Sequence, residues 1–201
     1  MAKEKVKDRI LNRAIDLFYT KGYHNTGINQ IIDESGTAKA SFYSYFKSKD
    51  DLAKAYLYAH SEMYIKRVKR IMQKHPEMVP YVNAKVDLLV RSIKQTTDFN
   101  GCALGNFTTQ LGRLEEEGKF GADIKTITED WFDLYSGFFA RAVLRGELIG
   151  DTDTRDLARK FTLIYEGSLT LWRMTESLDA LEQSRELYHA VLDPYRVEAR
   201  C

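Results

Sequence analysis

Proline and cysteine are scarce in this chain of 201 residues, which contains three prolines and two cysteines. The first proline is Pro76, so proline breaks no helix before that point. Cys102 and Cys201 are too few for a disulfide framework. No apolar run approaches the roughly 20 residues of a membrane span, and the charged start MAKEKVKDRI is unlike a secretory leader. We therefore expect a cytoplasmic protein that does not enter a membrane.

The patterns of common catalytic and metal sites are also absent from the sequence. Its four histidines have no metal-ligand spacing, and no serine or cysteine stands in a nucleophile motif. The small, glycine-containing stretch 98–107 lacks the lysine and hydroxyl of a phosphate-binding loop. We predict no catalytic residue, metal or cofactor, and no enzymatic activity. An all-α enzyme or a protein-binding adaptor remains the alternative from another functional class.

Apolar residues recur at steps of three and four along most of the chain, which favours an all-α fold. Hydrophobic residues make up 44% of the chain, enough for a buried core. We predict about nine helices, with a small N-terminal domain before a larger helical one. The expected helices span about residues 3–21, 27–35, 38–46, 49–74 and 82–97, a stretch ending near 116, then 122–145, 154–176 and 178–192.

The stretch from Lys21 to Lys49 contains two short helical segments separated by Gly36. Phe42 and Phe46 lie four residues apart and would bury one side of the second segment. Its other side then carries small, hydroxyl-bearing and basic residues. This order is typical of a helix-turn-helix, whose second helix enters the DNA major groove.

Capping residues set the expected ends of these segments. Thr26 or Gly27 would cap the first segment, with Gln30 placed to reach back. Ser48 would cap the following helix, with Asp51 at the capping-box position.

Charge is distributed unevenly, although the whole chain carries only +1. Residues 1–49 contain nine Lys or Arg and five Asp or Glu, a net +4. The remainder contains 21 and 24, a net −3. A basic head on a mildly acidic body is expected where only the head meets phosphate.

Residues 9–55 resemble the TetR family of ligand-responsive regulators. The matching residues are Ala14, Leu17, Phe18, Gly22-Tyr23, Thr26, Ile31, Gly36, Ser41-Phe42-Tyr43, Tyr45-Phe46 and Ser48-Lys49-Asp50-Asp51-Leu52. The resemblance implies a helix-turn-helix domain over residues 1–48 and an effector-binding and dimerisation domain over 49–201. It also implies a homodimeric repressor that a small molecule releases from double-stranded operator DNA. The DNA-binding residues predicted by position and by the exposed helix face are Asn29, Lys39, Ala40, Ser41, Tyr43, Ser44, Tyr45 and Lys49.

The larger domain offers an aromatic stripe that would suit a largely apolar or aromatic effector. The stretch GCALGN at 101–106 also resembles a segment that borders the effector cavity in some TetR proteins. The predicted effector-pocket residues are Cys102, Asn106, Phe107, Trp131, Tyr135, Phe138, Tyr165 and Trp172. Ordinary core packing is the alternative interpretation of the same stripe.

Cys102 supports a variant of this function, because a thiol near a helix N-terminus favours the reactive thiolate. Some TetR proteins sense electrophiles or oxidants through a cysteine in a comparable segment. Simple packing of a small apolar side chain is the alternative for Cys102.

The last two expected helices would pair with those of a second copy, because two half-sites are read by a two-fold dimer. The predicted interface residues are Phe161, Ser168, Leu171, Leu181, Tyr188 and Val191. Packing within one chain is the alternative.

Overall fold

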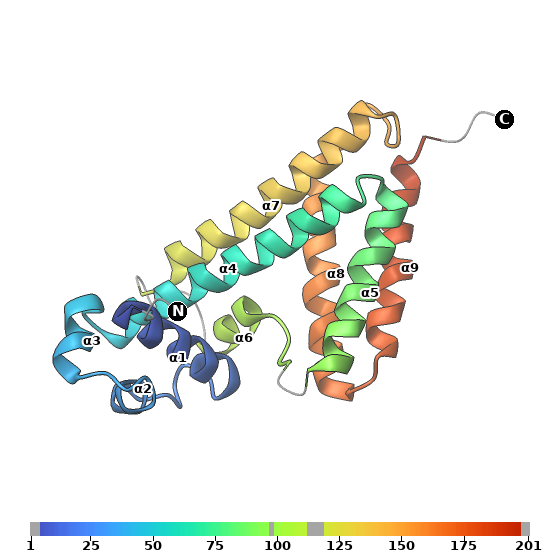
Figure 1. Cartoon of the computed structure of the whole chain (residues 1–201). Helices are drawn as coiled ribbons and strands as arrows, with labels where there is room; N and C mark the ends of the chain where they lie inside the picture. The colour runs from blue at the N-terminus through green and yellow to red at the C-terminus, as the bar shows by residue number, and fades with distance from the viewer. Residues whose placement is uncertain (1–4, 97–98, 112–118, 198–201) are drawn as a thin grey trace. The chain divides into compact units, whose positions relative to one another are not determined.

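The protein is all-helical in the computed structural model, which describes residues 5–96, 99–111 and 119–197 (Figure 1). Apart from one isolated bridge between Leu148 and Arg196, these residues contain no β-structure. The α-helices of the described residues are α1 (Val6–Thr20), α2 (Ile28–Glu34), α3 (Lys39–Tyr45), α4 (Lys49–Lys74), α5 (Met78–Gln95), α6 (Ala103–Gln110), α7 (Gly121–Leu144), α8 (Thr154–Thr175) and α9 (Asp179–Leu192). The predicted all-α class is confirmed.

Contacts divide the chain into two compact units. Unit 1 comprises Met1–Glu62 and Cys102–Thr126, and unit 2 comprises Met63–Gly101 and Ile127–Cys201. Helices α4 and α7 each begin in unit 1 and end in unit 2. In this division, α6 and the start of α7 group with the N-terminal helices. The domain boundary expected after residue 48 stays a prediction.

In unit 1, α1, α2 and α3 bury the apolar positions that recur every three or four residues. The buried side chains are Ile10, Ala14, Leu17, Phe18, Ile31, Ile32, Phe42 and Phe46. Gly36 turns the chain between α2 and α3 with a φ of +60°, which a residue with a Cβ rarely adopts. The predicted glycine turn is therefore confirmed, and the turn lets α3 leave α2 at an angle.

Aromatic rings hold α6 within unit 1. Phe107 on α6 lies 5.3 Å from the ring of Tyr23, 6.0 Å from that of Tyr56 and 5.0 Å from that of Phe120. Such tilted and edge-on ring pairs contribute beyond their buried area. The helix that follows the glycine-containing stretch is thus anchored on the residues after α1.

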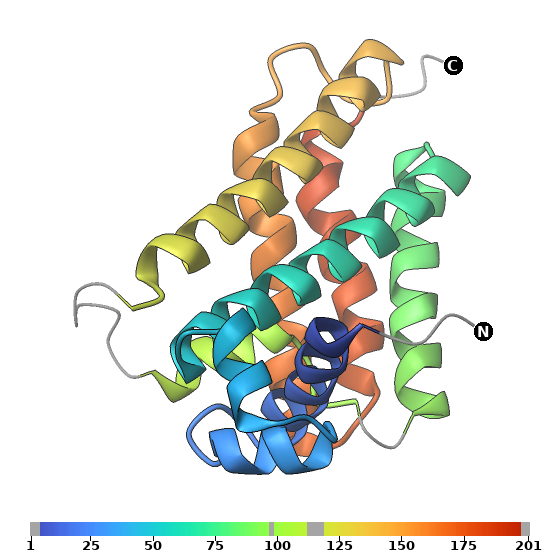
Figure 2. The ribbon, with the colours of Figure 1, turned by 60° about the vertical axis from the view of Figure 1, so that its left-hand side comes forward.

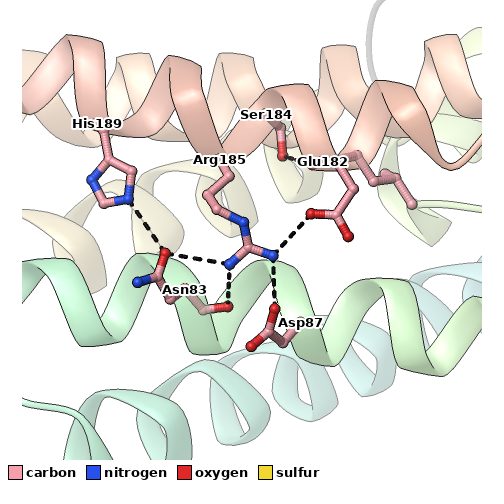
Figure 3. Close-up of polar contacts among 7 residues, drawn as sticks. Asn83, Asp87, Glu182, Ser184, Arg185 and His189 are labelled. Carbon is pink, nitrogen blue, oxygen red and sulfur yellow. Dashed lines mark hydrogen bonds and ion pairs between the residues drawn. The ribbon is translucent and has the colours of Figure 1, made fainter.

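In unit 2, helices α5, α8 and α9 lie side by side in both views (Figures 1 and 2). Arg185 on α9 joins α9 to α5 by donating to the carbonyl oxygen of Asn83 at 3.1 Å and to Asp87 at 2.7 Å (Figure 3). It also contacts Glu182 at 3.0 Å, while His189 Nε2 lies 3.3 Å from Asn83 Oδ1. These contacts fix the register of α5 against α9.

Candidate nucleic-acid interface

The outer face of α3 is the candidate DNA-reading surface of unit 1. Phe42 is fully buried and lies 6.1 Å, ring to ring, from the buried Phe46. These two anchors turn the rest of the helix toward solvent. Of the predicted DNA-binding residues on α3, Ser41 is partly buried and the others are exposed, namely Lys39, Ala40, Tyr43, Ser44 and Tyr45. A narrow helix face of small, hydroxyl-bearing and basic residues can approach base edges and phosphates closely.

Of the two residues expected to cap α2, Gly27 holds the N-cap position, whereas the expected role of Gln30 is not seen. Gly27 is the N-cap residue and makes no side-chain cap, while Thr26 is buried and donates to the carbonyl oxygen of Gly22 at 2.8 Å. Gln30 does not reach back, because its amide donates to Glu34 at 2.8 Å. Asn29, the predicted DNA contact on α2, is exposed. Thr26 therefore closes the end of α1 and does not open α2.

The predicted Ser48 cap at the start of α4 is confirmed, while Asp51 reaches back one residue further than a standard capping box. Ser48 Oγ accepts a hydrogen bond from the Asp51 N–H at 3.0 Å, and Asp51 Oδ2 accepts one from the Lys47 N–H at 3.1 Å. These two hydrogen bonds fix the turn between α3 and α4. The position of Lys49 relative to α3 follows from that turn.

Lys49 lies against an aromatic ring and beside a carboxylate. Its Nζ is 4.2 Å from the centre of the Tyr23 ring, and burial there lowers the pKa of Lys49. The Tyr23 hydroxyl donates to Asp50, and this bond holds the pKa of the Asp50 carboxyl below its usual value. Lys119 adds an ion pair to Asp50 at 3.2 Å. Lys49 is thus partly buried beside the Tyr23 ring, with its charge at the first turn of α4.

The predicted effector residues fall into the two units. Phe107, Cys102 and Asn106 belong to unit 1, and Phe107 is buried in the aromatic cluster described above. Unit 2 contains the other five. Trp131, Tyr135 and Phe138 are buried, and Tyr165 and Trp172 are partly exposed. Trp131 lies 4.2 Å, ring to ring, from Tyr64, while Trp172 lies 5.4 Å from Phe99. For Phe107, the structure supports the alternative of core packing.

Cys102 is the N-cap residue of α6. Its sulfur accepts a hydrogen bond from the Gly105 N–H at 3.4 Å. A backbone N–H at a helix start favours the thiolate form, but the residue is only 7% exposed, which limits access of a reagent. Sensing through Cys102 stays a prediction. Cys201 lies outside the described residues.

Lys85 is a buried polar residue that the sequence analysis did not identify. It lies on α5 among tyrosines of unit 2, with its Nζ 2.7 Å from the hydroxyl of Tyr135. The signal was present in the sequence, since Lys85 follows Tyr81 by four residues and Val82 by three and so shares their buried face. A charged residue on an apolar helix face is a better marker of a site than one more aromatic ring.

Most of the predicted dimer residues lie inside one chain. Phe161, Ser168, Leu181 and Tyr188 are buried, and the Phe161 ring lies 4.6 Å from that of Tyr188. Phe161 also packs on Tyr135 and Phe139 of α7, so this cluster is covered within its own chain. Leu171 is exposed and Val191 is partly exposed. A dimer interface through α8 and α9 stays a prediction, but these four side chains do not form its surface.

The described residues contain no group of three or more His, Cys, Asp and Glu side chains that could hold a metal ion. Over the same ranges, every helix is too short or too polar to cross a membrane.

Two protein families match the chain. Residues 10–56 match the family described as bacterial regulatory proteins of the tetR family, and residues 79–188 match the tetracyclin repressor-like C-terminal domain. The first match covers the helix-turn-helix and the Ser48 cap, and the second covers most of unit 2.

Individual proteins agree with these matches. An uncharacterised HTH-type transcriptional regulator from the lacX 3′ region of Lactococcus lactis is 29% identical over 184 residues, covering 90% of each chain. The HTH-type transcriptional repressor DhaR of a Mycobacterium species is 24% identical, covering 92% of this chain and 88% of DhaR. The crystal structure of a TetR-family transcriptional regulator from Cytophaga hutchinsonii has the same fold, with a TM-score of 0.81 at 16% identity over 98% of this chain and all of that one. The chain belongs to the TetR family and is a DNA-binding transcriptional regulator with an N-terminal helix-turn-helix.

Proposed function

We propose that the protein is a homodimeric repressor that binds operator DNA through α3 and is released by a small-molecule effector. The exposed face of α3 carries the proposal, because Phe42 anchors the helix while Tyr43, Tyr45 and Lys39 point to solvent. Tyrosine hydroxyls and a lysine ammonium can donate hydrogen bonds to phosphate oxygens and to acceptors on base edges. Operator binding also places the site of action in the cytoplasm.

The DNA part is tested by anisotropy with a labelled fragment from upstream of the protein's own gene. Tyr43→Ala is expected to weaken binding about 10-fold or more, as for a lost base or phosphate contact. Lys39→Ala is expected to lower the salt slope of log K by about 1. Lys69→Ala, an exposed lysine on α4 in unit 2, is the matched control and should bind like wild type. Binding that is insensitive to salt, or equal loss in the control, contradicts the proposal.

The dimer part is supported by an apolar stripe on α8. Leu163 and Met174 are 71% and 77% exposed, and Leu171 is exposed between them. Gly167 lies on the same face with nothing within 4 Å of a Cβ built on it, so a second helix can approach there. Exposed leucine and methionine at helical spacing favour association with an equivalent surface.

Sedimentation measures the dimer directly. Leu163→Glu together with Met174→Glu is expected to convert a dimer to a monomer. Leu144→Glu is the control, because Leu144 is 86% exposed but stands at the end of α7. If the double variant stays a dimer and the control variant becomes a monomer, the interface is not formed by this face of α8.

Release requires an effector with different affinities for the DNA-bound and released conformations. Unit 2 supplies aromatic rings for such a ligand, including Trp131, Tyr64 and Tyr165. The operator affinity should fall only as far as that difference in affinity allows. Effectors that bind both conformations equally will leave the anisotropy curve unchanged.

A further inference from the structure

Lys85 places a cation in the interior of unit 2. The residue is only 6% exposed, and its Nζ donates a hydrogen bond to the hydroxyl of Tyr135 at 2.7 Å. That hydroxyl lies 2.9 Å from the hydroxyl of Tyr64. A lysine ammonium is therefore joined to a pair of phenols below the surface.

Four tyrosine rings surround the ammonium, each from a different helix. The distances from Nζ to the ring centres are 4.7 Å for Tyr165 on α8, 5.3 Å for Tyr135 on α7, 5.8 Å for Tyr188 on α9 and 5.9 Å for Tyr64 on α4. Ring faces attract a cation, but more weakly than a negative charge does. We call Lys85 and these four tyrosines the Lys85 cluster.

The cluster contains no anion. Among residues 5–96, 99–111 and 119–197, no carboxylate oxygen lies within 4.0 Å of Lys85 Nζ, the distance limit for an ion pair. Burial raises the pKa values of Tyr64 and Tyr188, so these two phenols stay protonated and do not neutralise the ammonium. An ammonium removed from water is strongly disfavoured unless it is paired. The Glu166 carboxylate on α8 adds to the raised pKa of Tyr188 through its charge, but it makes no ion pair with Lys85. Within the described residues, the ammonium therefore lacks a direct anionic partner.

The cluster is less enclosed on one side. Tyr135 and Tyr188 are fully buried, whereas Tyr64 and Tyr165 are partly exposed. The rings of Tyr64 and Tyr165 lie 5.3 Å apart, and Tyr64 also contacts Trp131 at 4.2 Å. Because these two rings contact each other, a ligand would have to displace the partly exposed Tyr64 or Tyr165 ring to place its head at Lys85 and its body against aromatic rings.

We propose that the Lys85 cluster binds the carboxylate of an apolar or aromatic monocarboxylic acid. The ammonium of Lys85 would pair with one carboxylate oxygen. The Tyr135 and Tyr64 hydroxyls share one hydrogen bond, so one of the two would donate to the anion while that bond is kept. One cation with two phenols matches a single negative charge, whereas a phosphate would leave a second charge unpaired. The inference rests on the proposed function only in identifying this acid with the effector.

Trp131 provides the readout, because its ring contacts Tyr64. In a Trp172→Phe background, Trp131 is the single tryptophan and reports on the cluster. Benzoate and octanoate are titrated while its emission is followed, with benzamide and octanamide as uncharged counterparts. We expect a saturable change with at least one carboxylate, and binding of its amide at least about 10-fold weaker, as for a lost charged partner.

Substitution of Lys85 tests the assignment to this residue. Lys85→Met is expected to weaken the carboxylate at least about 10-fold, while the exposed control Lys69→Met binds like wild type. Tyr135→Phe removes only the phenol that holds Nζ and should weaken binding several-fold; it carries the test if Lys85→Met does not fold. The inference is overturned if neither carboxylate binds wild type below about 10 mM, a concentration that detects even weak sites. Equal binding of acid and amide, or of wild type and Lys85→Met, overturns it as well.

The same proteins are then tested for operator binding, which separates the two claims. Operator binding without carboxylate binding removes the inference and leaves the regulator intact. Carboxylate binding without operator binding supports the anion site and removes the proposed function. If both hold, the carboxylate should lower operator affinity in wild type and have at least about 10-fold less effect in Lys85→Met.

Discussion

The side-chain oxygen of Gln110 accepts a hydrogen bond from the backbone N–H of Tyr23 at 2.9 Å. In return, the carbonyl oxygen of Gln110 lies 2.9 Å from Nε2 of His24. The two contacts join the end of α6 to the residues that follow α1, within unit 1. A movement of α6 would therefore act directly on the end of the first helix of the DNA-binding head.

Gly22→Ala should destabilise this junction. Gly22 has a φ of +86°, and a Cβ placed on it would lie 2.6 Å from Gln110 Oε1. The left-handed conformation alone should cost an alanine about 1–2 kcal/mol. The free energy of unfolding in urea, followed by circular dichroism, measures the loss. Gly27→Ala is the matched control, since nothing lies within 4 Å of its Cβ and its φ is −91°; a similar loss there would contradict the explanation.

Ser48→Ala should remove the side-chain cap at the start of α4. The Asp51 N–H then loses its side-chain acceptor, and the expected cost is about 1 kcal/mol of unfolding free energy. Operator affinity should fall as well, because the cap fixes the start of α4, where the predicted DNA contact Lys49 stands. Ser48→Thr keeps the hydroxyl and should retain both properties. Loss of stability in both variants would mean that the hydroxyl is not the important group.

His60 should make the protein less stable in acid. Its ring stacks on Tyr19 at 5.4 Å and meets Tyr56 at 4.7 Å, and burial lowers the pKa of His60 to about 4. The unfolded chain protonates this histidine near pH 6.5, so it binds more protons than the folded chain between pH 6.5 and 4. The free energy of unfolding should therefore decrease as the pH is lowered from 6.5 to 4, by up to about 3 kcal/mol from this residue.

His60→Phe isolates the effect. Phenylalanine keeps the ring contacts, and no hydrogen bond is lost, because Nε2 of His60 has no partner within the part of the chain that the structure describes. Urea unfolding at pH 7, 6, 5 and 4 should give a shallower decline for the variant. Parallel curves for the two proteins would assign the acid sensitivity to other groups.

Helix ends followed from the sequence wherever a residue has a specific backbone or capping role. Helix α4 spans Lys49–Lys74 as predicted, because Ser48 caps its start and Pro76 disfavours a helical residue before it. The exposed face of α3 followed from the four-residue spacing of Phe42 and Phe46. These are local properties, and local sequence determines them.

The identity of the neighbour across an apolar face could not be predicted in the same way. Helical spacing shows that Phe161 and Tyr188 are buried, but it does not show whether their own chain or a second one covers them. Within one chain, the Phe161 ring packs on the Tyr188 ring and lies 6.1 Å, ring to ring, from Tyr135. The burial of Lys85 could not be predicted for the opposite reason. A lysine in a helix is usually solvated, and the burial of this one depends on four other helices.

Lys85→Met should leave the ligand-free protein as stable as wild type or more stable. The substitution removes an ammonium that is 6% exposed and replaces it with an apolar chain of similar length. The Tyr135 hydroxyl keeps the Tyr64 hydroxyl as a partner at 2.9 Å, so no polar group is left without a hydrogen bond by the change. We expect the free energy of unfolding to rise by about 1 kcal/mol or more, as when buried charges are replaced by apolar side chains.

A stabilised Lys85→Met protein would mean that Lys85 contributes to binding at the expense of stability, as residues of functional sites often do. Addition of the carboxylate should reverse the order, since a ligand stabilises only the protein that binds it. Thermal unfolding with and without benzoate or octanoate checks both parts. Lys69→Met supplies the comparison for removal of an exposed lysine. If Lys85→Met is less stable than wild type without ligand, the four tyrosine rings and the Tyr135 hydroxyl are sufficient partners for the ammonium, and its burial needs no ligand to explain it.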